Sequence, residues 1–398
     1  MKDLKHLIYF ENLLDETNNE LVRKAKEDGK LALGFTCYHM PEVLLNVDNC
    51  FSVRMRAPNT GSIDVASYYM SNYTCEYCRA LVERAIEGGY NFLDGICGVD
   101  ACAQMNRCME NIELLKCVDK PNFFVTHADI PYKYTDYTLK HYVTQMQNRV
   151  LNVMHEKLGV DISDAALREA VERHNEICRI ITEISELRKL QNPPVTGYEF
   201  HIINMVSFCC PQKLILPYLK ETLEEIKSRE PDAKPWYRCR VGIVGSEVDD
   251  PNLTRMLEDA GAFIAFDRFC FGALPGREVI ELNDEEPALV QICRHYLLTS
   301  ECPRFMSDEK INQRRETADR LAREFKADGI IYENVKFCDF WGFERALASH
   351  IQHEEYGHPV LTIDRPYNAK TSGQLRTRFQ AFVESLEIKR IQQGKEVK

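Results

Sequence analysis

Cysteine is the residue type through which this chain is most able to do chemistry. The 398 residues contain 16 cysteines. The opening MKDLKHLIYF has no apolar core followed by a small-residue cleavage site, so no signal peptide is expected. We therefore expect a cytoplasmic protein, whose reducing surroundings keep thiols from pairing as disulfides. Thiols at this density predict metal ligands, redox groups or small buried side chains.

Three cysteines occupy positions at which an α/β protein binds its ligands. Cys102 and Cys338 each lie shortly after a predicted strand, and Cys75 opens a predicted helix. Ligands of open parallel sheets bind beyond the carboxyl ends of the strands. We therefore expect Cys75, Cys102 and Cys338 to converge in a cleft, where they could ligate a metal.

The remaining cysteines fall into two groups. Cys78 forms a C-x-x-C pair with Cys75, a spacing typical of metal or redox sites, although no second C-x-x-C completes a four-thiolate zinc site. Cys97 and Cys302 lie near predicted loops, so for these two and Cys78 a ligand role and a structural role are both open. The other ten are expected to be buried structural side chains: Cys37, Cys50, Cys108, Cys117, Cys178, Cys209, Cys210, Cys239, Cys270 and Cys293.

Strands alternate with helices in two parts of the chain. The patterns in 31–134 and 236–398 predict two α/β lobes around parallel sheets. Residues 1–30 are predicted to form a helical segment, and 135–235 a helical connector. The segment VGIVGSE (241–247) lacks both G-x-G-x-x-G and G-x-x-x-x-G-K-[ST], so we predict no NAD or ATP site on this chain.

Charge and hydropathy exclude some partners. The net charge is −11, from 50 basic and 61 acidic residues, which argues against binding to nucleic acid or to an anionic membrane. No run approaches the ~18 apolar residues of a membrane span.

Three charged residues are candidates for contact with a substrate. Arg54 and Arg56 end a predicted strand, where they could bind a carboxylate or a CoA phosphate, or else form a solvated strand face. Glu42 follows Pro41 and could act catalytically at a substrate carbonyl. Its alternative role is that of an acid at a helix N-terminus, where it interacts with the helix dipole.

Several of these segments resemble the iron–sulfur subunits of 2-hydroxyacyl-CoA dehydratases and benzoyl-CoA reductases. The matching motifs are Cys75, the segment LDGICGVDAC that ends at Cys102, and VKFCDFWGFE around Cys338. TCYHMPEVLL (36–45) and GQLRTRFQAFVE (373–384) are also similar to segments of that family.

The resemblance covers roughly residues 31–386 and implies two flavodoxin-like lobes with a cluster in the cleft between them. It implies that Cys75, Cys102 and Cys338 ligate a [4Fe-4S] cluster. One departure is Ala103, which follows the second cysteine at a position where the family often has Asp.

The family's chemistry implies what this chain would do. A dimeric ATP-dependent activator delivers one electron of very low potential, under anaerobic conditions, to the cluster. The cluster passes it to a CoA thioester, which becomes a ketyl radical anion. Dehydratases then expel water, whereas reductases keep the electrons. The partner would be a homologous iron–sulfur subunit in a heterodimer, or a second copy in a homodimer.

Two alternatives stay open. One branch of the superfamily carries a double-cubane [8Fe-9S] cluster and reduces small molecules with the same type of activator. Its six ligands would correspond to Cys75, Cys78, Cys97, Cys102, Cys302 and Cys338. The other alternative belongs to a different class, a non-catalytic α/β protein with zinc or free thiols that binds a CoA ligand.

Overall fold

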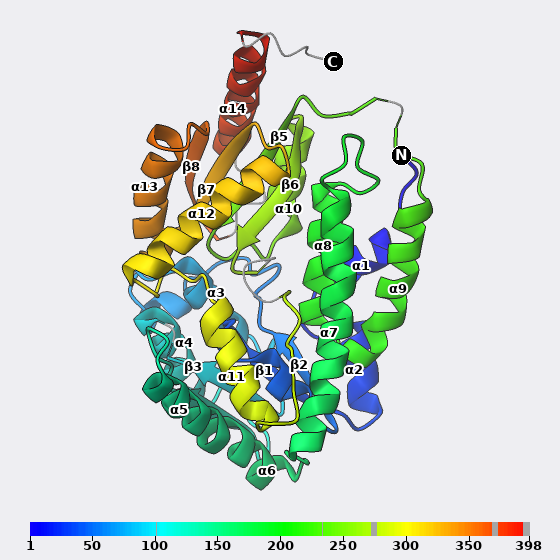
Figure 1. Cartoon of the computed structure of the whole chain (residues 1–398). Coiled ribbons are helices and arrows are strands. Elements are labelled where there is room, and N and C mark those ends of the chain that lie inside the picture. Colours follow the sequence, from blue (N-terminus) through cyan, green and yellow to red (C-terminus); the bar gives the residue numbers. More distant parts are fainter. Residues whose placement is uncertain (101, 233, 272–276, 368–372, 393–398) are drawn as a thin grey trace.

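The structure of the protein, a computed structural model, describes residues 1–100, 102–232, 234–271, 277–367 and 373–392. Within these residues the chain forms two four-stranded parallel sheets, in the orders β2-β1-β3-β4 and β6-β5-β7-β8 (Figure 1). Each order repeats the 2-1-3-4 arrangement of a flavodoxin-like sheet. The predicted α/β fold of two flavodoxin-like lobes is thereby confirmed.

The first sheet has helices on both faces. Its strands are β1 (Leu31–Phe35), β2 (Cys50–Arg54), β3 (Gly95–Val99) and β4 (Phe124–Ala128). One face is covered by α2 (Glu20–Glu27), α3 (Glu76–Ile86) and α4 (Ala103–Leu114). Because side chains alternate along a strand, Ala32 of β1 faces these helices while Leu33 and Phe35 face the other side.

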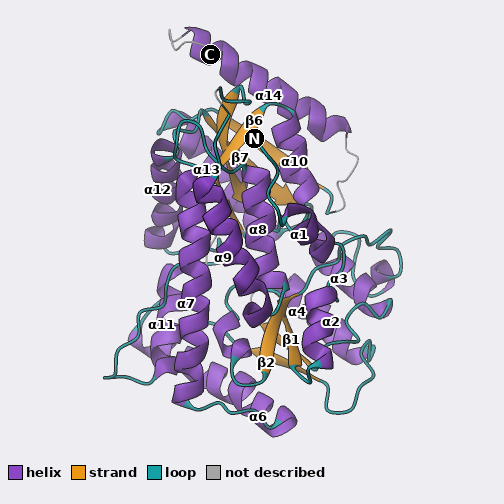
Figure 2. Cartoon of the chain, turned by 90° about the vertical axis from the view of Figure 1, so that its right-hand side faces the viewer, coloured by secondary structure: helices purple, strands orange, loops and turns teal. Residues whose placement is uncertain are grey.

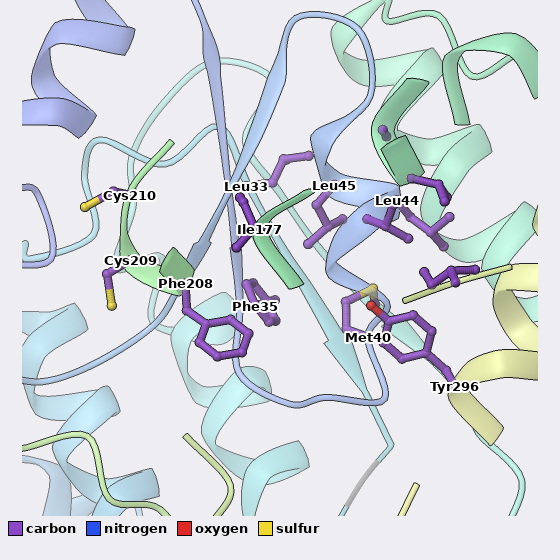
Figure 3. Packing of buried hydrophobic residues seen from close by; sticks show 14 of the residues in the cluster. Leu33, Phe35, Met40, Leu44, Leu45, Ile177, Phe208, Cys209, Cys210 and Tyr296 are labelled. Carbon is purple, nitrogen blue, oxygen red and sulfur yellow. The ribbon is translucent and has the colours of Figure 1, made fainter. Parts of the chain in front are cut away.

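The other face packs against the helical part of the chain. Leu33, Phe35, Ile177 and Phe208 belong to this largest core (Figure 3). The elements that contribute to it are α1 (Leu7–Leu14), the 3₁₀ turn η1 (Glu42–Asn46), α5 (Asp136–Gln145), the π-helical turn η3 (Met146–Leu151), α6 (Asn152–Leu158), α7 (Asp164–Leu187), α8 (Gly197–Cys209), α9 (Gln212–Ser228) and α11 (Ala288–Thr299).

Helices α7 and α9 lie side by side along one flank of the molecule (Figure 2). Their exposed edges carry ion pairs at seven-residue intervals, which keeps each charge on the same side of its helix. The pairs are Glu169–Lys213 at 3.8 Å, Glu176–Lys220 at 2.5 Å and Glu183–Lys227 at 2.7 Å. Exposed pairs of this kind contribute only about 0.2–1 kcal/mol each, so they add little to the stability of the helix pair.

The second lobe repeats the arrangement of the first. Its strands are β5 (Cys239–Gly245), β6 (Ala262–Phe269), β7 (Gly329–Val335) and β8 (Val360–Arg365). Helices α10 (Pro251–Asp259) and α14 (Gly373–Gln392) cover one face, and α12 (Asp308–Glu324) and α13 (Asp339–Glu354) cover the other. Among the described residues no helix combines the length and the apolar composition needed to cross a bilayer.

Gly242, in the middle of β5, allows the ring of Phe266 to pack directly on the strand. A Cβ at Gly242 would lie 2.1 Å from Phe266 Cζ. We expect Gly242→Ala to lower the free energy of unfolding by about 1–3 kcal/mol, because the overpacked core must shift. The matched control is Gly342 in α13, where the nearest atom to a Cβ is Asn334 Nδ2 at 3.9 Å.

We expect Gly342→Ala to stabilise the protein by about 0.5–1 kcal/mol, because alanine loses less backbone entropy than glycine in a helix. Urea unfolding of both variants checks the pair. Equal destabilisation by the two substitutions would contradict the packing argument.

Candidate metal centre

The carboxyl ends of the two sheets face each other across one cavity of about 120 Å³. Its lining comes from the segments that follow β1, β2 and β3 in the first lobe and β5, β6 and β7 in the second. Doubly wound sheets bind ligands at this end, where connections leave in opposite directions. The cavity therefore lies where both lobes could contribute to one site.

Cysteine dominates the chemistry of this cavity. All 16 cysteines lie in the described parts of the chain as free thiols. Seven of them line the cavity: Cys37, Cys75, Cys78, Cys102, Cys270, Cys302 and Cys338. We call the cavity with these seven residues the thiol pocket. It brings together Cys75, Cys102 and Cys338, the three side chains that the sequence predicted to converge, and also Cys78 and Cys302.

Three cysteines lie elsewhere than expected. Cys97 does not reach the thiol pocket: it is the third residue of β3, and its side chain is fully buried in the apolar core. This corrects its inclusion in the six-cysteine set. Cys37 and Cys270, for which the sequence predicted a structural role, line the pocket instead. They follow β1 and β6 by only one or two residues, so the strand-end rule that singled out Cys102 would have found them.

Burial keeps most of these thiols protonated. It raises the pKa of Cys102 to about 12 and that of Cys37 to about 11. The pKa of Cys338 lies well above its ordinary value, because of burial and then the charge of Cys75. Thiolates that lie close together in an apolar cavity repel one another, which disfavours the charged form of each, unless a positive group lies between them. A bound cationic metal group would supply that charge and displace the protons.

Cys75 is the exception. It is the N-cap of α3, and Cys78 follows in the first turn. A hydrogen bond from the Cys78 thiol, together with the N–H groups of Cys78 and Tyr77, outweighs burial and lowers the pKa of Cys75. A thiolate at a helix N-terminus is both a good nucleophile and a good metal ligand.

The thiols surround a space and do not converge on one point. Among the described residues, no three His, Cys, Asp or Glu side chains are arranged to hold a single metal ion. The thiol donors come from several segments around the cavity, which suits a multinuclear group larger than one ion. Iron–sulfur clusters are such groups and are held by cysteine thiolates.

An ion pair between the lobes forms part of the pocket wall. Arg54, the last residue of β2, donates from Nη2 to both carboxylate oxygens of Glu247 at 3.2 Å. The guanidinium also lies 4.4 Å from the ring centroid of Phe271. Burial outweighs the charge of Arg54 and raises the pKa of Glu247 to about 7. Glu247 is thus a buried carboxyl poised near neutrality, which no motif in the sequence singles out.

The predicted substrate residues separate in space. Arg54 lines the thiol pocket, whereas Arg56 does not. Arg56 donates to the backbone carbonyls of Leu14 and Asp249, which joins the two lobes beside the pocket. It lines a second, more polar cavity of about 280 Å³ on the neighbouring surface.

Glu42 lies outside the thiol pocket, within the largest core. Its Oε1 is 3.1 Å from His174 Nδ1, and His174 Nε2 is 3.3 Å from the sulfur of Cys178. Burial would raise the pKa of Glu42, but His174 and Arg277 lower it. Burial would likewise lower the pKa of His174, but Cys178 and Glu42 raise it to about 10. The structure therefore places Glu42 in a buried ionic contact between η1 and α7.

This contact predicts a pH dependence of stability. The folded-state pKa of His174 is raised from 6.5 to about 10, so its contribution is complete below pH 6.5 and is lost as the pH rises through about 10. We expect His174→Gln to destabilise the protein most at pH ~6 and much less near pH ~10. Urea unfolding of both proteins at the two pH values measures the difference. A difference that does not change with pH would contradict a charged His174.

The chain matches known proteins over most of its length. The family described as 2-hydroxyglutaryl-CoA dehydratase, D-component, matches residues 37–386. The (R)-phenyllactyl-CoA dehydratase beta subunit of Clostridium sporogenes is 24% identical over 377 residues, covering 95% of this chain and 97% of that protein. The (R)-2-hydroxyglutaryl-CoA dehydratase subunit beta of Acidaminococcus fermentans is 23% identical, with 92% and 95% covered.

A relative with a different named activity matches as well. It is a benzoyl-CoA reductase subunit of Thauera aromatica, 22% identical over 325 residues, which cover 81% of each chain. Dehydratase and reductase subunits thus both resemble this chain at similar, low identity. Because the family match spans 37–386, the chain belongs to the 2-hydroxyglutaryl-CoA dehydratase D-component family, in the superfamily of 2-hydroxyacyl-CoA dehydratases and benzoyl-CoA reductases that the sequence predicted.

Proposed function

We propose that this chain is the iron–sulfur subunit of an enzyme that dehydrates or reduces a CoA thioester with an electron from an ATP-dependent activator. The observation that carries the proposal is the convergence of Cys75, Cys102 and Cys338 on one cavity. They come from three separate segments, two in the first lobe and one in the second. A cysteine that only fills the core need not lie beside cysteines of other segments, whereas the ligands of one cluster must lie together.

The residues present fit a [4Fe-4S] cluster. Thiolate is the donor that iron–sulfur clusters use, and three thiolates leave one iron with an open position for substrate. Cys75 already has a lowered pKa, whereas Cys102 and Cys338 would lose protons on binding the metal. When bound, the cluster would supply electron transfer at low potential and a Lewis-acidic iron.

The chain's own residues would bind and orient the substrate. Arg54 presents a permanent positive charge in the pocket wall, suited to a carbonyl oxygen that gains negative charge. Glu247 is held against Arg54 and has a pKa of about 7, so it could give or accept a proton near neutral pH. Most of the residues that line the pocket are buried, and a site with little water protects reactive species.

The partners follow from the relatives. The dehydratase relatives are named as beta subunits, and the reductase relative is likewise named as one subunit of its enzyme. We therefore propose that this chain assembles with a homologous subunit or with a second copy of itself. The substrate would be an acyl-CoA, and the electron donor a dimeric ATP-dependent activator with its own [4Fe-4S] cluster.

A second candidate function is the double-cubane reductase with an [8Fe-9S] cluster, which acts on small molecules. The observation that favours it is the number of thiols, because seven cysteines line the pocket and a single cubane takes about four. One of Cys37 and Cys270 would replace Cys97 in the six-cysteine ligand set.

Anaerobic purification followed by iron, sulfide and zinc analysis tests both candidates. About four irons per chain supports the single cubane, and about eight supports the double cubane. Zinc, or no metal after anaerobic reconstitution, would instead indicate the non-catalytic thiol protein. Turnover of 2-hydroxyacyl-CoA with activator, ATP and reductant then separates dehydration from reduction.

A further inference from the structure

Trp341 connects two segments of the thiol pocket that follow different strands. It lies in the first turn of α13, three residues after Cys338, and is 3% exposed. Its indole N–H donates to the sulfur of Cys270, with an N–S distance of 3.1 Å. Trp341 therefore connects the segment after β7, which carries Cys338, to the thiol that follows β6.

The indole group of Trp341 can only donate a hydrogen bond. An indole nitrogen donates a hydrogen bond and never accepts one. A sulfur atom accepts more strongly as it gains negative charge, and hydrogen bonds to ionised groups are about twice as strong as neutral ones. The contact thus favours negative charge on the sulfur of Cys270.

Hydrogen bonds to cluster sulfurs are one of the levers by which a protein sets a reduction potential. The reduced cluster carries one more negative charge than the oxidised cluster, so a donor at its sulfurs stabilises the reduced form. Arg54 and Glu247 also line the pocket, but they form an ion pair with each other. Trp341 instead directs its indole N–H at a sulfur.

We propose that Trp341 is a redox-tuning residue, which holds Cys270 as a ligand sulfur beside Cys338 and raises the reduction potential of the group that they bind. The inference rests on the double-cubane form of the proposed function, with Cys270 as the sixth ligand in place of Cys97. The step concerned is the gain of one electron by the cluster, supplied in the test by titanium(III), which is oxidised to titanium(IV).

The test compares two substitutions in the reconstituted holoprotein. The chain has 2 tryptophans, and Trp236 is 41% exposed and does not line the pocket. Trp341→Phe keeps an aromatic ring and removes the indole N–H. We expect it to lower the equilibrium constant for one-electron reduction about tenfold, which is 59 mV. We expect Trp236→Phe to leave the midpoint potential unchanged in an EPR-monitored titration.

A second measurement keeps the test decisive even when Trp341→Phe loses its metal. In the Trp236→Phe background, 5-fluorotryptophan replaces Trp341 alone. Fluorine makes the indole N–H a stronger donor, so the potential should shift upward, opposite in sign to Trp341→Phe. The ring and its packing are otherwise kept. If Trp341 had only a structural role, the potential would therefore not shift.

The outcomes separate the two proposals. Shifts of opposite sign support Trp341 as a tuning residue. Trp236→Phe protein that binds a cluster but shows the same potential with and without fluorotryptophan would overturn the inference and leave the proposed function intact. Wild-type protein that takes up no iron at all would overturn the proposed function, and this inference with it.

Discussion

Cys338→Ser is expected to lose its iron–sulfur absorbance and to turn over substrate at least about 100-fold more slowly. Changing a residue that only hydrogen-bonds to a metal ligand already lowers metal affinity or activity by about 10–100-fold, so the loss of a ligand itself should cost more. A serine oxygen is a harder and far more basic donor than a thiolate, and it suits iron–sulfur clusters poorly. Cys338 follows β7 and lines the pocket opposite Cys75 and Cys102 in the first lobe. Its loss would remove the second lobe's member of this set.

Cys117→Ser is the matched control. Cys117 is a half-buried thiol of the first lobe and does not line the pocket. We expect normal iron content in this variant, since no pocket donor is lost. Iron analysis and visible absorption under anaerobic conditions measure both proteins. An unchanged spectrum in Cys338→Ser would remove this residue from the ligand set.

Arg365→Met is expected to have the largest effect on stability. Arg365 is 2% exposed, and its Nε lies 2.6 Å from Oε1 of Glu333, whose side chain is fully buried. It also donates to the backbone carbonyl of Glu247, so it fixes the strand ends that carry the pocket wall. Removing one partner of a buried ion pair costs about 3–5 kcal/mol, because the other charge is left uncompensated.

The double variant Arg365→Met/Glu333→Gln isolates the charge effect. Glutamine keeps the shape of Glu333 and an acceptor for Ser246, which donates to Glu333 at 2.9 Å. We expect the double variant to be more stable than Arg365→Met alone. Burial already raises the pKa of Glu333, so the defect of the single variant should shrink at acidic pH as Glu333 protonates. Denaturant unfolding across pH checks both expectations, and a pH-independent defect would contradict them.

Local patterns were enough to predict the architecture. The apolar run 31–35 became β1 and the segment 329–335, which begins with an apolar run, became β7, because buried parallel strands are rich in apolar residues and have turn residues at their ends. The same patterns placed Cys102 and Cys338 after strands. Since carboxyl ends of parallel strands share one edge, their convergence with Cys75 followed from topology.

The prediction for Cys97 was wrong because it depended on where a strand begins and ends. The pattern of 91–99 predicts one strand that runs into a loop, which places Cys97 near the ligand side. The structure starts β3 at Gly95 and ends it at Val99, so Cys97 is a central strand residue directed into the core. Strand ends are the least certain part of a sequence prediction, and a shift of a few residues moves a side chain from a loop to the core.

By itself, the sequence determined the family and the two lobes, and it predicted that Cys75, Cys102 and Cys338 lie near one another, because these features depend on local residue patterns. Only the tertiary structure decided which thiols share a cavity, that Arg54 pairs with Glu247, and that Trp341 donates to Cys270. These contacts join segments far apart in the chain. They depend on how the two lobes face each other and on the direction of each side chain, which no local pattern encodes.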